Sequence, residues 1–512
     1  MSNSGRMAKN MIAQIISFAL NLGINFFLTP YMVTSLGKEV YGFVNLAYSF
    51  TSYINIAVVA INSLLARYIT INIKQEKYEN ANKYFASVTL VNIVFAFTLV
   101  VPSAILILFL DSVINIPVGF VSDIKILWAF IFASILLSIA TTSFHVSTFA
   151  ANRLDLEGIR NMQNHIIRCV MLLIIFSVFK PHVWYVGLTA LVCNIFLTYI
   201  TYQYLCTLTP QLKISKRFFD FSAVKELLVN GIWNSINQLA SILMDGLDLF
   251  IANLFIGALE MSLMSYSKTI PVHLTNLIAL ISNTFVPQMT ISYAEGNMNK
   301  FIKEINRAMR LSTFLCSVPI IGFMIFGYSF FHLWLPSLSE REIAMIQILS
   351  VLTLLPALFN IFSYPLSSVQ TIMCKLRIPV ILTFMIGVIN LICVIYLLNT
   401  TNLGIFGIKL ISSILLMFKV LLFTPMYTAH NLGVKLMTFY PMIIKGTVIN
   451  ILIALIFSGY IIILDINSWL VFILSVIICA FVGYGINYLL LLNQSERKYI
   501  CKRFCSKESV KI

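Results

Sequence analysis

Long apolar runs separated by short polar loops make up most of the chain. A bilayer core of about 30 Å needs about 20 apolar residues in a helix, so the pattern predicts about 14 membrane-spanning helices. We therefore expect an all-α polytopic membrane protein. The predicted spans are residues 11–34, 41–66, 84–110, 122–146, 166–180, 184–206, 229–256, 263–288, 308–333, 342–366, 378–399, 404–428, 441–464 and 468–492.

Composition supports this fold class. Of the 512 residues, 59% are hydrophobic and 10% are charged, whereas about one-quarter of the residues of a soluble domain are charged. The apolar run after the basic N-terminus is long enough to span, so we expect a retained first helix and no cleaved signal. The nine cysteines show no metal-binding spacing, and we expect neither a metal nor a cofactor.

The charged residues predict a topology. With a cytoplasmic N-terminus, most of the 34 Lys and Arg residues fall on the cytoplasmic side, including Arg153, Arg160 and Arg168 in one expected loop. Both termini are therefore expected in the cytoplasm. The net charge of +15 does not indicate nucleic-acid binding, because the basic residues lie in short loops and form no continuous stripe. The opposite side receives Lys38, Lys125, Lys180 and Arg341.

A weak internal repeat divides the chain. A shift of 220 residues aligns Asn10 with Asn230, Ile16 with Ile236 and Gly37 with Gly257. A tandem unit of six spans keeps its orientation, so we expect two parallel repeats around a polar crevice, working by alternating access. The predicted parts are a first bundle (1–210), a second bundle (211–435), two appended helices (436–492) and a basic cytoplasmic tail (493–512).

The stretch "NLGINFFLTPYMVTSLGKEVYGFVNLAYSFTSYI" carries a resemblance to a known family. With its Pro30, Leu36-Gly37, Tyr41-Gly42 and the later Arg67-Tyr68, it resembles the opening of the polysaccharide repeat-unit flippases, which handle O-antigen and other lipid-linked oligosaccharides. These belong to the MATE/oligosaccharidyl-lipid/polysaccharide (MOP) exporter superfamily. One departure is "INSLLARY", where the family often has a glycine-containing turn.

The resemblance implies a function. Such a flippase moves a polyprenyl-diphosphate oligosaccharide from the cytoplasmic to the outer leaflet of the bacterial inner membrane, for surface polysaccharide synthesis. It is a transporter and not an enzyme, and polysaccharide polymerase machinery is its expected partner. The prenyl chain is expected to stay in lipid beside the two appended helices.

Three other functions predict different sequence features. A MATE-type cation-coupled drug antiporter is expected to have twelve spans. A major-facilitator transporter would have a glycine-rich loop in place of "INIKQEKYENANKYF". A membrane polysaccharide polymerase or ligase would carry a large outer loop, and the sequence has none.

Two carboxylates interrupt the seventh predicted span. Asp245 and Asp248 in "ASILMDGLDLFIANLF" are three residues apart and share a helical face. Ionisable residues inside a membrane usually face a cavity or a partner. In the repeat register Asp245 aligns with Asn25, so the first and seventh spans should both present polar faces. In one interpretation Asp248 forms an ion pair with Lys268 that only pins two spans together. In the other, the acids bind a coupling H⁺ or Na⁺ or sugar hydroxyls, and the lysines bind the diphosphate.

Other polar residues of the spans complete the candidate set. Lys419 lies in the middle of the twelfth span, and Lys409 lies nearer the outer end, where its side chain could extend to the surface. Arg67 either receives the diphosphate or serves only topology. His145 is interpreted as a hydrogen-bonded packing residue. Two interpretations stay open for the tyrosines and asparagines of the first two spans: they line the cavity and bind sugar, or they pack between helices. These residues are Asn21, Asn25, Tyr48, Tyr53 and Asn55.

Overall fold

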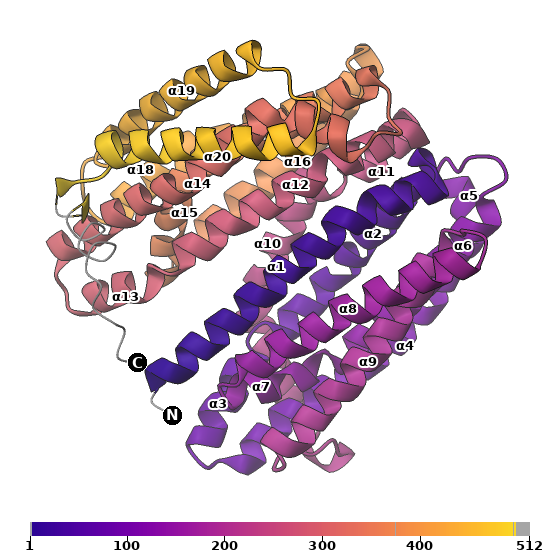
Figure 1. The fold of residues 1–512 in the computed structure, drawn as a ribbon. Coiled ribbons are helices and arrows are strands. Elements are labelled where there is room, and N and C mark those ends of the chain that lie inside the picture. Colours follow the sequence, from indigo (N-terminus) through magenta and orange to yellow (C-terminus); the bar gives the residue numbers. More distant parts are fainter. Residues whose placement is uncertain (1–2, 374, 495, 498–512) are drawn as a thin grey trace. The chain divides into compact units, whose positions relative to one another are not determined.

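The computed structural model describes residues 3–373, 375–494 and 496–497 (Figure 1). Within these residues the protein is all-helical, with 87% helix and no strand. The helices of the first part are α1 (Asn3–Leu36), α2 (Lys38–Asn62), α3 (Leu65–Lys74), α4 (Tyr78–Leu108), α5 (Leu110–Val113), α6 (Val121–Thr141), η1 (Thr142–His145), α7 (Val146–Ala150), α8 (Leu154–Val178), α9 (Trp184–Leu208), η2 (Lys216–Phe218), α10 (Phe221–Ser241), η3 (Ile242–Gly246) and α11 (Asp248–Phe255).

Two of the remaining helices are longer than thirty residues. They are α12 (Ala258–Asn283), α13 (Val286–Ala294), α14 (Met298–Trp334), α15 (Glu340–Ile372), α16 (Arg377–Thr400), α17 (Gly404–Phe418), η4 (Lys419–Phe423), α18 (Thr424–Asn431), α19 (Tyr440–Ile463), α20 (Trp469–Ile486) and η5 (Asn487–Leu491). In the described part of the chain, 13 helices are long and apolar enough to cross a membrane, or 14 if one bent pair counts as a span. The predicted fold class is confirmed.

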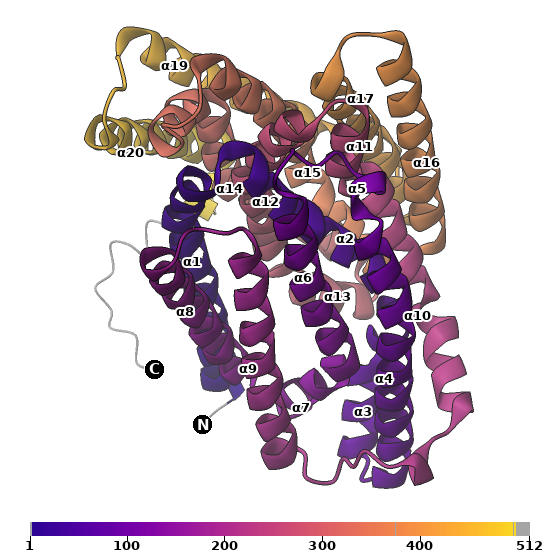
Figure 2. The same ribbon diagram turned by 90° about the vertical axis from the view of Figure 1, so that its right-hand side faces the viewer.

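The chain divides into two compact units, Met1–Ser262 and Leu263–Ile512. In the first unit α1 packs on α8, α6 packs on α9 and α4, and α10 packs on α2 (Figure 2). In the second unit α14 packs on α15, α19 and α20. The predicted boundaries at residues 210, 435 and 492 were drawn from the internal repeat of the sequence. A division into compact units does not test them, so they stay predictions. Most of the predicted basic tail lies outside the described residues.

The backbone repeats with the spacing that the sequence predicts. Gly37 separates α1 from α2, and Gly257 separates α11 from α12. Glu76 and Gly296, again 220 residues apart, both have positive φ (58° and 70°) in the turns before α4 and α14. A positive φ is easy for glycine and uncommon for glutamate, so the turn is conserved between the halves even where the residue is not.

The fifth predicted span was wrong in its bounds. Residues 166–180 were expected, but α8 runs from Leu154 to Val178, so Arg160 lies in a helix and not in a loop. The first turns of α8 carry charged residues, so their low hydropathy did not indicate a membrane-spanning helix. These charges are paired within the first unit: Asp155 with Arg153 at 2.9 Å, and Glu157 with Arg160 at 3.7 Å.

Candidate functional site

The two carboxylates of the seventh span lie at a break between helices. Helix α10 runs into the π-helical turn η3, and the pair formed with α11 is bent by 41°. Asp245 is half-buried within η3, and Asp248 is the first residue of α11 with 2% of its surface exposed. A carboxylate at a helix N-terminus is stabilised by the helix dipole, and π-turns often occur at functional sites. The two acids therefore mark a break within the span.

Tyr53 of α2 holds this break. Its hydroxyl donates a hydrogen bond of 2.7 Å to the carbonyl oxygen of Gly246, and it lies close enough to Asp248 to interact with its charge. A π-turn leaves backbone carbonyls without their helical partner, and in a membrane a neighbouring side chain must satisfy them. Tyr53, predicted as a polar residue of the second span, thus belongs to the same site as the acids.

Asp220 caps the N-terminus of α10. The Asp220 carboxylate caps the helix by accepting the Ser222 backbone N–H at 2.8 Å, which satisfies an amide that has no helical partner. Hydrogen bonds from the side chain and backbone of Ser222 lower the pKa of Asp220.

The predicted residues of the first and second spans are half-buried or exposed. Asn25 is half-buried on α1 and donates to Asn21 at 2.8 Å, one helical turn earlier. Tyr48 is 38% exposed and Asn55 is half-buried. Asn21 and Asn25 therefore form one polar pair on the helix that the repeat relates to α10.

Arg67 lies on α3, which begins after a break at Ser63 and Leu64, and its side chain is exposed. Next to it, the Tyr68 hydroxyl accepts a hydrogen bond from Asn230 at 3.0 Å. The sequence had placed Arg67 at the end of a single long helix. The break after α2 replaces the glycine-containing turn that the family resemblance led us to expect.

The predicted lysines lie in the second unit. Lys268 is half-buried on α12. Lys419 is the first residue of the π-turn η4 and is half-buried, and no carboxylate or other hydrogen-bonding group of the described residues contacts its ammonium. The expectation that Lys409 extends to the surface was wrong, because its side chain is only 2% exposed. A pair of Asp248 with Lys268 would join the two units and stays a prediction.

Sequence analysis missed a polar stripe along α10. Glu226, Asn230, Asn234, Asn237 and Ser241 follow at intervals of four, four, three and four residues, and all five side chains are exposed. The periodicity of a helix places such positions on one face, so this signal was present in the sequence. At the repeat-related positions α1 carries Asn10, Gln14, Ser17 and Asn21 in place of the last four.

A buried arginine was also missed. Arg160 is 2% exposed and donates to Thr201 at 2.7 Å and to Asn161 at 3.2 Å. His145 lies 3.3 Å from the same guanidinium, in accord with its interpretation as a hydrogen-bonded packing residue. Because His145 and Thr201 lie 15 and 41 residues from Arg160 in the sequence, a local pattern does not predict these two contacts. Among the residues that the structure describes, no group of His, Cys, Asp or Glu has the arrangement of a metal site.

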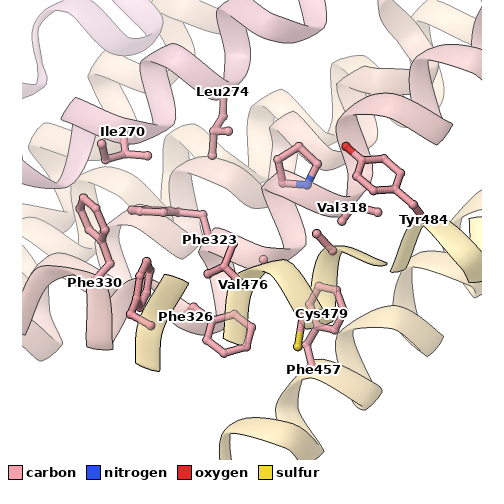
Figure 3. Close-up of a pocket in the computed structure, with 14 residues that line it drawn as sticks. Ile270, Leu274, Val318, Phe323, Phe326, Phe330, Phe457, Val476, Cys479 and Tyr484 are labelled. Carbon is pink, nitrogen blue, oxygen red and sulfur yellow. The ribbon is translucent and has the colours of Figure 1, made fainter. Parts of the chain in front are cut away.

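The second unit contains an apolar cavity of about 290 Å³ (Figure 3). Its walls come from α12, α14, α19 and α20, so the two C-terminal helices contribute one side. The Tyr484 hydroxyl at its edge donates to the carbonyl oxygen of Leu315 at 3.1 Å. The lining residues are Ile270, Leu274, Val318, Pro319, Gly322, Phe323, Phe326, Phe330, Phe457, Phe472, Val476, Cys479, Ala480 and Tyr484.

Comparison with solved structures identifies the fold as that of the MOP superfamily. The lipid II flippase MurJ in an inward closed conformation aligns with a TM-score of 0.70 and 14% identity, covering 94% of this chain and 98% of its own. An inward-facing multidrug resistance MATE family transporter of the MOP superfamily aligns with a TM-score of 0.68 and 14% identity, covering 84% and 98%. At these identities the likeness concerns the fold, and the chain is a multi-pass membrane protein with that fold.

A particular relative is more similar in sequence. The chain is 27% identical over 511 residues to the uncharacterized membrane protein EpsK of Bacillus subtilis (strain 168), with 97% of each chain covered. No family model matches the sequence.

Proposed function

We propose that the protein is a flippase that moves a polyprenyl-diphosphate-linked oligosaccharide from the cytoplasmic to the outer leaflet for surface polysaccharide synthesis. The observation that carries the proposal is the apolar cavity bordered by α19 and α20. A cargo with a long hydrocarbon chain needs a surface that accepts this chain while its head group crosses elsewhere. The phenyl and aliphatic walls of the cavity suit a stretch of isoprenoid, because they replace the van der Waals contacts that the chain makes with lipid.

The polar head group meets a different problem. An isolated phosphate charge in hydrocarbon is disfavoured by many kcal/mol, so a flippase must offer hydrated and cationic surroundings. In this proposal Lys419 binds the diphosphate, because its half-buried ammonium has no protein partner within the described chain. Lys268 and Arg67 are the second and third cationic candidates. Asn25 is assigned to sugar contacts, and Asp245 and Asp248 to a coupling H⁺ or Na⁺ or to sugar hydroxyls.

The proposal includes a location and a mechanism. The chain would lie in the bacterial cytoplasmic membrane with both termini in the cytoplasm, next to polysaccharide polymerase machinery that consumes the flipped lipid. The support is the excess of Lys and Arg in alternate loops. Alternating access is supported by the backbone repeat between the halves, because related bundles can open in turn to either side.

A second candidate function is cation-coupled export of a small molecule. Two carboxylates at a bent span favour it, since such acids can bind a proton or a sodium ion. This alternative makes no use of an isoprenoid-sized apolar cavity.

Deletion of the gene and complementation with the intact chain distinguish the two functions. A flippase mutant should lose surface polysaccharide and accumulate the lipid-linked oligosaccharide in the cytoplasmic leaflet. Unchanged surface polysaccharide together with increased sensitivity to drugs would refute the flippase and support the antiporter. A strain that carries a filled cavity (G322F) should show the flippase defect in part, whereas drug export should be insensitive to it.

A further inference from the structure

The polar stripe of α10 extends along most of a membrane-spanning helix. It runs over the 16 residues from Glu226 to Ser241, a rise of about 22 Å at 1.5 Å per residue. Its side chains are carboxylate, amide and hydroxyl groups, and all of them are exposed. Such a face cannot lie against hydrocarbon, because unsatisfied polar groups are strongly disfavoured there. The stripe therefore borders a hydrated path.

At the repeat-related positions of α1, the polar side chains are used for packing against other parts of the first unit. Asn10 donates to Asn152 at 3.3 Å and accepts from the Asp155 backbone N–H at 2.9 Å, and Gln14 donates to the Leu154 carbonyl at 3.2 Å. Ser17 is buried at 5% exposure. In α1 these groups thus fasten α8, so their polarity is explained by packing.

In α10 the groups retain free bonding capacity. Asn230 donates to Tyr68 at 3.0 Å and Asn234 donates to Ser63 at 3.1 Å, which uses one N–H of each amide. Their carbonyl oxygens and the Asn237 side chain make no hydrogen bond within the described residues. An amide has two N–H groups and an oxygen that accepts twice, so each can still bind a ligand.

Aromatic rings stand beside one end of the stripe. The ring centroids of Tyr68 and Tyr84 are 5.1 Å apart, and the Tyr84 hydroxyl donates to the Glu226 carboxylate at 2.6 Å. Rings with a polar edge next to amides offer an apolar face for the C–H surface of a pyranose and hydrogen-bonding groups for its hydroxyls. The stripe itself contains no Lys or Arg and ends in a carboxylate, so it disfavours a diphosphate.

We infer that the α10 stripe, with Tyr68 and Tyr84, binds the neutral, hydroxyl-rich sugars of the cargo, separately from the cations that take the diphosphate. This inference rests on the proposed function. It assigns the sugars of the head group to one set of residues and the diphosphate to another. It adds the exposed face of α10 to the residues already proposed for sugar contacts, which are Asn25, Asp245 and Asp248.

The test uses the full chain in liposomes and two fluorescent probes: a polyprenyl diphosphate that carries a neutral tetrasaccharide, and the same lipid diphosphate without sugar. In the triple variant N230L/N234L/N237L, movement of the sugar-bearing probe should fall at least about tenfold, because three amides lose their hydrogen bonds to the sugar hydroxyls. Movement of the sugar-free probe should not change. The single variant N234Q, which keeps the amide, should retain most of the activity.

The matched control is N399L, which removes an exposed asparagine from α16, away from the stripe. It should leave both probes unaffected. Thermal unfolding of each variant shows that the protein is folded. Equal loss of both probes, or loss of neither, would overturn the sugar assignment while leaving the flippase proposal in place. If the wild type moves neither probe, the flippase proposal fails and the inference fails with it.

Discussion

Tyr53 and Gly246 are joined by a hydrogen bond of 2.7 Å between a side-chain hydroxyl and a backbone carbonyl, across 193 residues of sequence. This contact ties α2 to the π-turn in which the seventh span bends. Both residues belong to the first unit, so the bend is held by that unit's own packing.

Replacement of Tyr53 by Phe removes this hydrogen bond and leaves a carbonyl without a partner. We expect the free energy of unfolding to fall by about 1–3 kcal/mol, because a half-buried carbonyl loses its hydrogen-bond donor. Thermal unfolding of the purified chain measures the change. The control Y396F alters a tyrosine of α16 that is 70% exposed and should leave the stability unaltered. Equal effects of the two substitutions would contradict the role of Tyr53.

Asp155 fastens α1 to the start of α8. Its carboxylate is 2% exposed and meets Arg153 at 2.9 Å and Lys9 at 3.1 Å. Asp155→Asn keeps the shape but removes the charge, so we expect a loss of about 1–3 kcal/mol of stability. The exposed pair of Glu79 with Lys83, at 3.6 Å, supplies the control E79Q, for which at most about 0.5 kcal/mol is expected. A D155N variant as stable as E79Q would show that the buried pair contributes nothing.

Close packing of α10 on α2 depends on Gly231. A methyl group there would overlap the backbone carbonyl oxygen of Ala60, which cannot move without a shift of the helix. Gly231→Ala should therefore destabilise the protein by about 1–3 kcal/mol. The control is G459A on α19, where the added methyl meets open space and the better helix propensity of alanine should be neutral or stabilising. A neutral result at both glycines would argue against tight contact between α2 and α10.

Glu496 anchors the segment after η5 to α14. Arg310 donates to its carboxylate at 2.9 Å. Burial raises the pKa of Glu496, but hydrogen bonds from Arg310 and the Asn493 backbone N–H outweigh it, so the net pKa lies below the ordinary value of 4.5. A lowered pKa means that the contact stabilises the folded state above pH 4.5 and is lost as the pH falls below it.

Hydrogen exchange of residues 489–494 tests this anchor. Protection, corrected for the intrinsic pH dependence of exchange, should decrease as the pH falls below about 4.5. The variant E496Q should lack this decrease and be less protected at neutral pH. In contrast, E295Q removes an exposed partner of Lys300 and should preserve the wild-type profile. A pH-independent protection in the wild type would rule out the anchor.

Lys419 either binds the diphosphate or serves only in packing, and the two roles predict opposite changes in stability when the lysine is replaced. If the ammonium binds the diphosphate, Lys419→Met should reduce transport at least about tenfold, while removal of an unpaired, half-buried charge raises the free energy of unfolding. Transport in liposomes and thermal unfolding are measured on the same preparation. K419R should keep part of the activity, and K445M on the exposed side of α19 should keep all of it. Loss of stability in K419M would indicate a packing role.

Much of the fold follows from local pattern. The apolar runs predict the spans because a helix must cover the hydrocarbon thickness with apolar side chains. The bounds failed at α8, where Arg153, Asp155, Glu157 and Arg160 lower the hydropathy of a segment that is nevertheless helical. Those charges are tolerated because residues from α1 and α9 reach them, and a linear pattern does not contain these contacts.

The candidate site also has features that the sequence predicts and features that it does not. The sequence by itself determined which positions are anomalous, namely Asp245, Asp248, Lys268 and Lys419, because a charged residue in an apolar run is visible without any structure. It also determined the 220-residue repeat, which the turns at Glu76 and Gly296 reproduce. Only the tertiary structure decided that Asp245 and Lys419 lie in π-turns, that Lys409 is buried, and that the polar stripe of α1 is bonded while that of α10 stays exposed. The physical reason is that hydrogen bonding and burial depend on neighbours brought from distant parts of the chain, whereas hydropathy is a property of each residue alone.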